Sequence, residues 1–225
     1  MDKEAWDKTY KWQDHNHCYW PPDLKFLWAR GDEKLHGDIP TLAHLDQFVF
    51  PLVFDKQVAI QAGGAMGMWA KRMGQVFNHV YTFEPNPQSA YCCSFNNPEE
   101  NVHVYNAALG NKHEFIKVGT PNYEENYGAN RVVGQGHVPT LRIDDFEFQT
   151  LNLLMLDIEG YELFALQGAF ETIKRCHPVI VLEDKGCSKE FGYQKGKVER
   201  YLKNQQGYST HSRFHGGRDV ILTYS

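Results

Sequence analysis

The sequence has little of what marks proteins of membranes, of secretion or of nucleic-acid binding. Its longest apolar run, Phe48 to Phe54, contains Pro51 and is far shorter than a membrane span. The first residues are charged and include no apolar stretch of the kind found in signal peptides. The formal net charge is −5, so the chain has no overall excess of basic residues to attract phosphate backbones. We therefore expect no membrane span and no nucleic-acid partner.

Cysteine is scarce and follows no binding pattern. There are five cysteines, an odd number, and no Cys-x-x-Cys pair occurs among them. Reduced thiols are the simplest interpretation, and together with the charged first residues they predict a cytoplasmic location. His15, His17 and Cys18 resemble metal ligands, but without further spaced ligands they predict no metal site.

Length and composition fit one α/β domain with an extension. The chain has 225 residues, of which 42% are hydrophobic and 23% charged, as in ordinary globular proteins. Four of the five tryptophans fall within the first 28 residues. We expect an aromatic-rich N-terminal cap over residues 1–50 and the main domain over residues 51–225. The cap either only covers the core or also closes over a binding site.

A glycine-rich turn between a strand and a helix is the feature around which we expect the fold to be organised. Val58 to Ala62 is a short apolar run, typical of a strand that is buried on both faces. Three glycines follow it: Gly63, Gly64 and Gly67. Apolar residues then recur at helical spacing, and a second strand, Val80 to Phe83, ends in Glu84. This order is typical of a nucleotide-binding α/β unit whose acid holds a ribose diol.

Strand and helix patterns alternate along the rest of the chain. Further strands are expected at residues 102–106, 113–118, 151–157, 179–184, 208–211 and 220–224. The alternation predicts an α/β fold with a mostly parallel sheet and helices on both faces. Ligands bind at the carboxyl ends of such strands, so the polar residues there form one candidate rim. They are Glu84, Asn106, Asp157 and Glu183.

Two other segments carry structural expectations. One continuous helix is expected after Gly160, because apolar residues recur at helical spacing as far as Ile173. Residues 119–136, which are rich in glycine and asparagine, are expected to form a long loop of the kind that is often functional.

Three motifs give the chain a family resemblance. Phe83-Glu84-Pro85-Asn86-Pro87 follows the second strand, and Leu156-Asp157-Ile158-Glu159-Gly160-Tyr161-Glu162 follows the buried strand of the second half. The third motif is Ile143-Asp144-Asp145. With these motifs, residues 55–224 resemble the FkbM-type family of class I methyltransferases, which use S-adenosyl-L-methionine (SAM). The resemblance implies a Rossmann-like seven-stranded sheet whose last strand is antiparallel, SAM as cofactor, and O-methylation of a saccharide or other small molecule.

The resemblance also implies residue roles in cofactor binding. The glycines of the turn would line the methionine part of SAM, and Glu84 would hold the ribose hydroxyls. Asn106 and Ala107 would border the adenine. Glu84 could instead cap a neighbouring helix, and Asn106 could only stabilise its own turn.

Two positions depart from the family pattern. The family usually has an acid at the position of Gln61 and an asparagine at that of Ala65. Gln61 can form hydrogen bonds within the predicted cofactor site, but it offers no charge to the methionine ammonium. SAM would then be bound more weakly, or its ammonium would be held elsewhere.

Three acids are the catalytic candidates. We expect Asp157 and Glu159 beside the transferred methyl group, with one of them acting as general base or orienting group, and Glu183 as a third candidate. In the alternative interpretation, Asp157 and Glu159 cap the following helix, whose first turn favours acids. Paired acids can also bind a divalent cation, although none is predicted here.

Two other functions remain open from the sequence. Ala62-x-Gly64-x-x-Gly67 followed by Glu84 also resembles a dinucleotide fingerprint, which would suit an NAD(P)-dependent oxidoreductase. The neutral Gln61 and Ala65 would also suit a non-catalytic protein with the SAM-binding fold. The sequence leaves the acceptor and the oligomeric state undecided.

Overall fold

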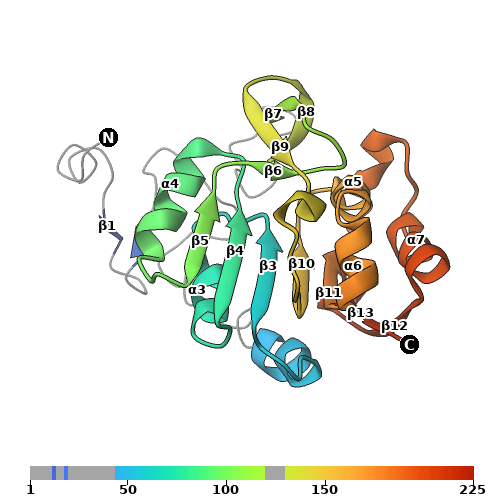
Figure 1. The fold of residues 1–225 in the computed structure, drawn as a ribbon. Coiled ribbons are helices and arrows are strands. Elements are labelled where there is room, and N and C mark those ends of the chain that lie inside the picture. The colour runs from blue at the N-terminus through green and yellow to red at the C-terminus, as the bar shows by residue number, and fades with distance from the viewer. Residues whose placement is uncertain (1–11, 14–17, 20–43, 120–129) are drawn as a thin grey trace.

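The computed structural model describes residues 12–13, 18–19, 44–119 and 130–225 (Figure 1). The predicted N-terminal cap therefore lies largely outside the described residues. Within it, strands β1 (Trp12–Gln13) and β2 (Cys18–Tyr19) pair antiparallel. Strand β2 lies close to helix α4 (Pro87–Asn96). The boundary between a cap over residues 1–50 and a domain over residues 51–225 stays a prediction.

A seven-stranded sheet forms the centre of the fold, in the order β12-β13-β11-β10-β3-β4-β5. Its strands are β3 (Val58–Ala62), β4 (His79–Phe83), β5 (Val102–Tyr105), β10 (Leu153–Leu156), β11 (Val179–Glu183), β12 (Tyr208–Phe214) and β13 (Asp219–Tyr224). The neighbours from β11 to β5 pair parallel, whereas β13 is antiparallel to both β11 and β12. The sheet is therefore mixed but mostly parallel, and it confirms the predicted α/β fold with its antiparallel last strand.

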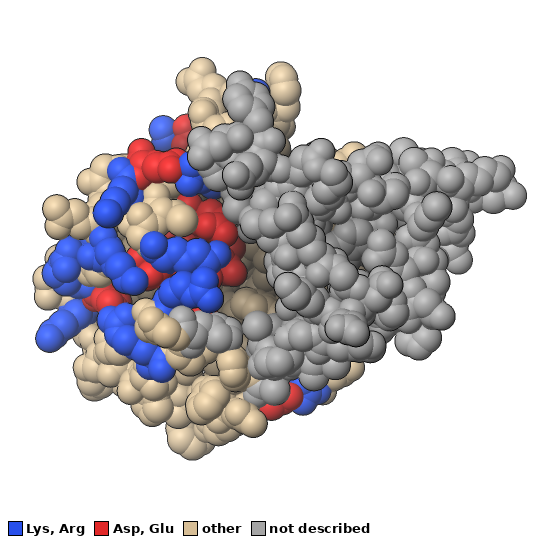
Figure 2. Space-filling model, turned by 180° about the vertical axis from the view of Figure 1, so that it is seen from behind, with Lys and Arg blue, Asp and Glu red and all other residues tan. Residues whose placement is uncertain are grey.

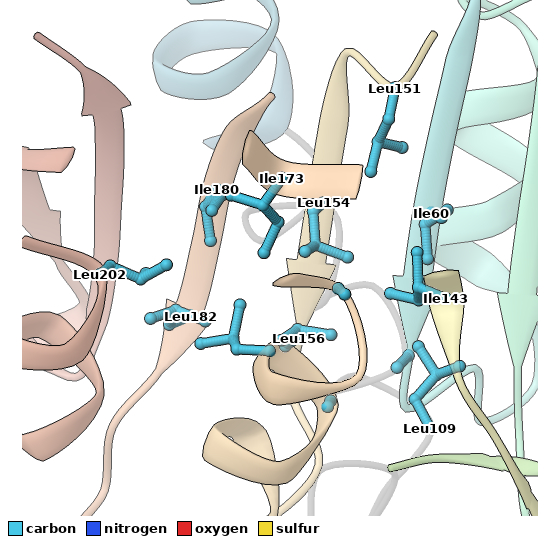
Figure 3. Packing of buried hydrophobic residues seen from close by; sticks show 14 of the residues in the cluster. Ile60, Leu109, Ile143, Leu151, Leu154, Leu156, Ile173, Ile180, Leu182 and Leu202 are labelled. Carbon is cyan, nitrogen blue, oxygen red and sulfur yellow. The ribbon is translucent and has the colours of Figure 1, made fainter. Parts of the chain in front are cut away.

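The central strands are apolar runs because both faces of the sheet are covered. Every residue of β3 and of β10 is buried. Successive side chains alternate between two cores, so that Ile60 belongs to one core and Ala59 to the other. Figure 3 shows the first core, where Ile60, Leu154 and Ile180 of neighbouring strands lie in one layer.

Helices cover both faces, as predicted. On the face shown in Figure 3 are α5 (Glu162–Gln167), α6 (Phe170–Cys176) and α7 (Lys197–Gln206). The opposite face is covered by the π-helical turn η3 (Leu45–Val49), the 3-10 turn η4 (Phe50–Leu52) and α3 (Met68–Gly74). No helix in the described parts of the chain is both long and apolar enough to span a membrane.

The continuous helix expected after Gly160 is wrong, because α5 and α6 are separate helices. A side chain on Gly168 would overlap the backbone of Gly110, so the chain passes Gly110 closely at this point. The carboxylate of Asp144, in the 3-10 turn η7 (Ile143–Phe146), then accepts hydrogen bonds from the amides of Glu171 and Thr172. Asp144 thereby satisfies amides in the first turn of α6 and starts a second helix.

The long loop expected over residues 119–136 is also partly wrong. Strand β8 (Arg131–Gln135) pairs antiparallel with β7 (Phe115–Gly119), and residues 120–129 lie outside the described residues. These strands join β6 (Ala108–Leu109) and β9 (Val138–Leu141) in a four-stranded sheet. The small sheet lies between β5 and β10 in the chain and therefore begins at the carboxyl end of the large sheet (Figure 1).

Charges of both signs are mixed on the surface. Figure 2 shows Lys and Arg side chains gathered on the side formed by the C-terminal elements, with Asp and Glu side chains between them. Ion pairs account for part of this mixture, including Arg213 with Glu199 and Arg131 with Glu190.

Candidate active site

The glycine turn between β3 and α3 is fixed by the protein backbone. The amides of Gly63 and Gly64 both donate to the carbonyl oxygen of Phe83, each at 3.0 Å. Gly63 has a φ of +86°, and a side chain there would overlap the carbonyl oxygen of Asp157. Glycine is required at this position because strands β3 and β10 end against each other. The turn therefore lies directly beside the first of the predicted catalytic acids.

Gln61 lies beneath this turn and is only 1% exposed. Its Nε2 donates to the carbonyl oxygen of Gly63 at 2.7 Å, and its Oε1 accepts from the hydroxyl of Thr82 at 2.5 Å. The side chain thus links the turn to β4. Its predicted role in cofactor binding stays a prediction, and these contacts show a structural role.

Glu84 follows β4 and is buried at the edge of the same turn. Its carboxylate accepts from the amide of Ala65 at 2.7 Å and from the amide of Asn86 at 2.8 Å. Burial raises the pKa of Glu84 from 4.5 to about 7, although these two amides oppose the rise. A carboxylate has about four acceptor positions, so acceptor capacity remains for the two hydroxyls of a ribose.

Hydrogen bonds of neighbouring residues bear on the alternatives for Glu84 and Asn106. Helix α4 is capped by Asn86, whose side chain accepts from the amides of Gln88 and Ser89, so that helix does not use Glu84 as its cap. The side-chain amide of Asn106 donates to the carbonyl oxygens of Glu84 and Pro85 at 2.9 and 3.2 Å. Asn106 therefore joins the turns after β4 and β5, as the structural alternative expects. Ala107 is buried beside it, and a border to adenine stays a prediction for both.

The three catalytic candidates come together at the ends of β10 and β11. Carboxylate oxygens of Asp157, Glu159 and Glu183 lie within 4.8 Å of one another. The ammonium of Lys185 contacts Glu159 at 2.9 Å and Glu183 at 2.5 Å. We call Asp157, Glu159 and Glu183, together with Lys185, the acid cluster. Lys185 stands only two residues after Glu183, and the sequence alone leaves its role undecided.

Electrostatics divide the roles within the acid cluster. Burial raises the pKa of Asp157 well above its usual range, and the charge of Glu183 and a hydrogen bond with it raise that pKa further. The acids around Lys185 raise its pKa above the usual range, although burial opposes the rise. Protonation is thus favoured at Asp157 more than at an exposed aspartate, and Lys185 carries its positive charge.

The loop after β10 folds back to present Glu159 to the cluster. Glu159 has a φ of +53° and Gly160 a φ of +104°. The buried Glu162 accepts from the amides of Ile158 and Gly160, and burial raises its pKa to about 7. Glu162 thus satisfies two amides of the loop that precedes α5.

A small pocket opens beside the acid cluster. It is lined by residues 159, 160, 162 and 183–188, all of which lie at the carboxyl ends of β10 and β11. The pocket joins the two acidic loops at the predicted rim of the sheet. Glu159 and Glu183 both line this pocket.

Comparison with known proteins identifies a family. The sequence matches the family model described as the methyltransferase FkbM domain over residues 68–210, more than half of the chain. That span contains Glu84, Asn106 and the acid cluster, whereas the glycine turn precedes it. No curated protein matches the sequence.

Solved structures share the fold. A methyltransferase FkbM from Methylobacillus flagellatus KT aligns with a TM-score of 0.54 and 15% identity, over 82% of this chain and 48% of that protein. The chain thus spans about half the length of that protein. A putative methyltransferase from Streptococcus mutans, solved in complex with SAH, aligns with a TM-score of 0.46 and 12% identity. That alignment covers 82% of this chain and 94% of the other.

Proposed function

This chain belongs to the FkbM methyltransferase domain family, and from this premise we propose that it transfers the methyl group of SAM to a hydroxyl of a saccharide or other small molecule. The observation that carries the proposal is the meeting of Asp157, Glu159 and Glu183 beside the glycine turn. Acids from two strand ends thus lie where the turn and Glu84 would hold a nucleoside. The strand order supports methyl transfer over hydride transfer, because dinucleotide-binding sheets lack the inserted antiparallel strand β13.

The described residues fit the adenosyl part of SAM. Glu84 keeps acceptor capacity for a diol at the tip of β4, and Gly63 and Ala65 of the neighbouring turn are partly exposed and carry no large side chain. The fit is weaker for the ammonium of the methionine part, since Gln61 is neutral and already bonded within the protein. We therefore propose Glu84 as the main cofactor-binding side chain.

The acid cluster supports transfer to an oxygen. SAM held by Glu84 and the glycine turn would supply an activated methyl group with sulfur as its leaving group. The chain must orient the acceptor hydroxyl and remove its proton. Because burial and the neighbouring Glu183 raise the pKa of Asp157, we assign the base role to Glu183 or Glu159 and an orienting role to Asp157.

The cysteines support the proposed cytoplasmic location. Cys92, Cys93, Cys176 and Cys187 are free thiols, and the first two are buried. Free thiols are typical of reducing compartments.

Ligand-dependent unfolding tests the cofactor. The protein would be unfolded thermally with SAM, S-adenosylhomocysteine, NAD and NADP in parallel, with each ligand at high concentration. A ligand present at about 100 times its dissociation constant stabilises by roughly 2.7 kcal/mol. We expect a rise in melting temperature with the two adenosyl ligands alone. A rise with a nicotinamide ligand would overturn the proposal, and no rise with any ligand would favour a non-catalytic protein.

The base role has its own test. Release of S-adenosylhomocysteine from SAM would be followed with a panel of hydroxylated acceptors, and the active acceptor would be used to compare variants. We expect Glu183→Gln or Glu159→Gln to lose at least about 100-fold in turnover, the usual contribution of a general base. Calorimetric binding of S-adenosylhomocysteine should stay within a few-fold. Full turnover in both variants would refute the assignment.

A further inference from the structure

Lys185 occupies an unusual position for a lysine. It follows β11, and its side chain is 31% exposed and reaches both Glu159 and Glu183. The loop that carries it is held by Asp184, whose carboxylate accepts from the amides of Gly186 and Gly196 at 3.2 and 2.8 Å. The backbone that carries Lys185 is therefore fixed, unlike that of a lysine on a free surface loop.

The acids are held from both sides. Oε1 of Glu159 contacts Lys185, and Oε2 accepts from the thiol of Cys187 at 3.3 Å. A side chain on Gly160 would come within 2.7 Å of the backbone of Cys187 and Ser188, so the two acidic loops pack closely against each other. The positions of the carboxylates and of the ammonium thus depend on one another.

Three converging carboxylates are also the ligand type that divalent cations prefer. Here the ammonium already lies 2.9 and 2.5 Å from two of the three acids. A metal ion bound to the same oxygens would lie within a few ångströms of this charge. The ammonium and a metal ion would then compete for the same carboxylates. Because the lysine is covalently part of the chain, its ammonium has the advantage in this competition.

We propose that Lys185 is the resident cation of this site: it positions Glu159 and Glu183 and keeps divalent metal ions out, so that methyl transfer needs no metal. The part about methyl transfer rests on the proposed function. Exclusion of the metal is a property of the folded chain and can be measured without any substrate. Lys185 acts through the two acids and is therefore a positioning residue.

Binding of Mn²⁺ tests the proposal directly. Lys185→Met keeps the length of the side chain and removes its charge, whereas Lys185→Arg keeps a charge. Lys203→Met makes the same change at an exposed position of α7 and serves as the matched control. Free Mn²⁺ would be followed by electron paramagnetic resonance at increasing protein concentration. In Lys185→Met we expect a gain of at least roughly a thousand-fold in affinity for one Mn²⁺, because that factor corresponds to two unit charges about 4 Å apart near a protein surface and Mn²⁺ carries two charges.

The gained ion must be bound by the acid cluster. Adding Glu183→Gln to Lys185→Met should abolish the gain, and Lys185→Arg and Lys203→Met should behave as the wild type. A folded Lys185→Met variant that gains no Mn²⁺ affinity would overturn the proposal. If that variant does not fold, Mn²⁺ binding is measured on the wild type. Mn²⁺ binding by the wild type that Glu183→Gln removes would overturn the proposal, and a wild type that binds no Mn²⁺ would support it.

The readouts separate the two proposals. Binding of S-adenosylhomocysteine, measured by calorimetry on the same wild-type protein, reports on the proposed function. Failure to bind it would refute the function and leave the Mn²⁺ result intact. Conversely, turnover that exhaustive chelation abolishes and Mn²⁺ restores would refute the role of Lys185 and leave methyl transfer in place.

Discussion

Glu84 provides a quantitative test of how the site is built, because a buried carboxyl links folding to pH. Its pKa is 4.5 in the unfolded chain and about 7 in the folded protein. Below pH 4.5 both states hold the proton, and above pH 7 both have lost it. Between these values the folded state binds the proton more tightly. The wild type therefore loses stability as pH rises from about 4.5 to about 7.

The size of the effect follows from the same two values. At 1.36 kcal/mol per pH unit, a rise in pKa from 4.5 to about 7 corresponds to about 3 kcal/mol. Glu84→Gln removes this dependence because glutamine does not titrate. The variant also loses one of the two hydrogen bonds from Ala65 and Asn86, which costs roughly 1–3 kcal/mol at every pH. The difference between variant and wild type should thus shift by about 3 kcal/mol in favour of the variant between pH 4.5 and 8.

Urea unfolding at several pH values measures this difference. The cost of the lost hydrogen bond cancels in the comparison across pH, and Glu162 titrates in both proteins. Glu100→Gln, at an exposed position, controls for the loss of one carboxylate and should shift much less. Parallel pH profiles for Glu84→Gln and the wild type would refute the reasoning that burial sets this pKa. Binding of S-adenosylhomocysteine should fall at least about 10-fold in Glu84→Gln, since part of the acceptor for the diol is lost.

Three further substitutions test the turn. Ala65 has a φ of +44°, so Ala65→Gly should relieve strain and stabilise by up to about 1 kcal/mol in urea unfolding; a destabilised variant would contradict this. Gly63→Ala should destabilise by roughly 1–3 kcal/mol more than Gly186→Ala, because both have a φ of +86° but only the first meets a backbone carbonyl. Equal losses would show that overlap with Asp157 is unimportant. Gln61→Glu replaces the donor that faces the carbonyl oxygen of Gly63, and should cost about 2 kcal/mol or more without improving S-adenosylhomocysteine binding. Tighter binding by this variant would show that an acid is tolerated at the turn.

Local patterns predicted the parts of the fold that depend on nearby residues. Val58 to Ala62 is apolar throughout, and the structure buries every residue of β3. Strands of this kind, each followed by a turn and a helix, give a parallel sheet, so the carboxyl ends of β4, β10 and β11 had to share one edge. That reasoning was enough to bring Asp157 and Glu183 together.

Other features depend on contacts between distant segments. The break between α5 and α6 requires Gly168 to pass the backbone of Gly110 and Asp144 to bind the amides of α6. The helical spacing through Leu166 and Ile173 contains no sign of either contact. Strand β8 was missed for a similar reason, because its pairing with β7 outweighs the weak strand preference of a segment containing Gly134.

The sequence by itself determined which chemical groups lie at the rim, because strand ends and their acids follow from local patterns. Only the tertiary structure decided what each group does there. In the structure, Gln61 donates a hydrogen bond to the glycine turn, and Glu162 accepts from an amide before α5. Lys185 forms ion pairs with Glu159 and Glu183. The physical reason is that a hydrogen bond or ion pair depends on side-chain direction and burial, and both are set by loops that fold back from distant parts of the chain.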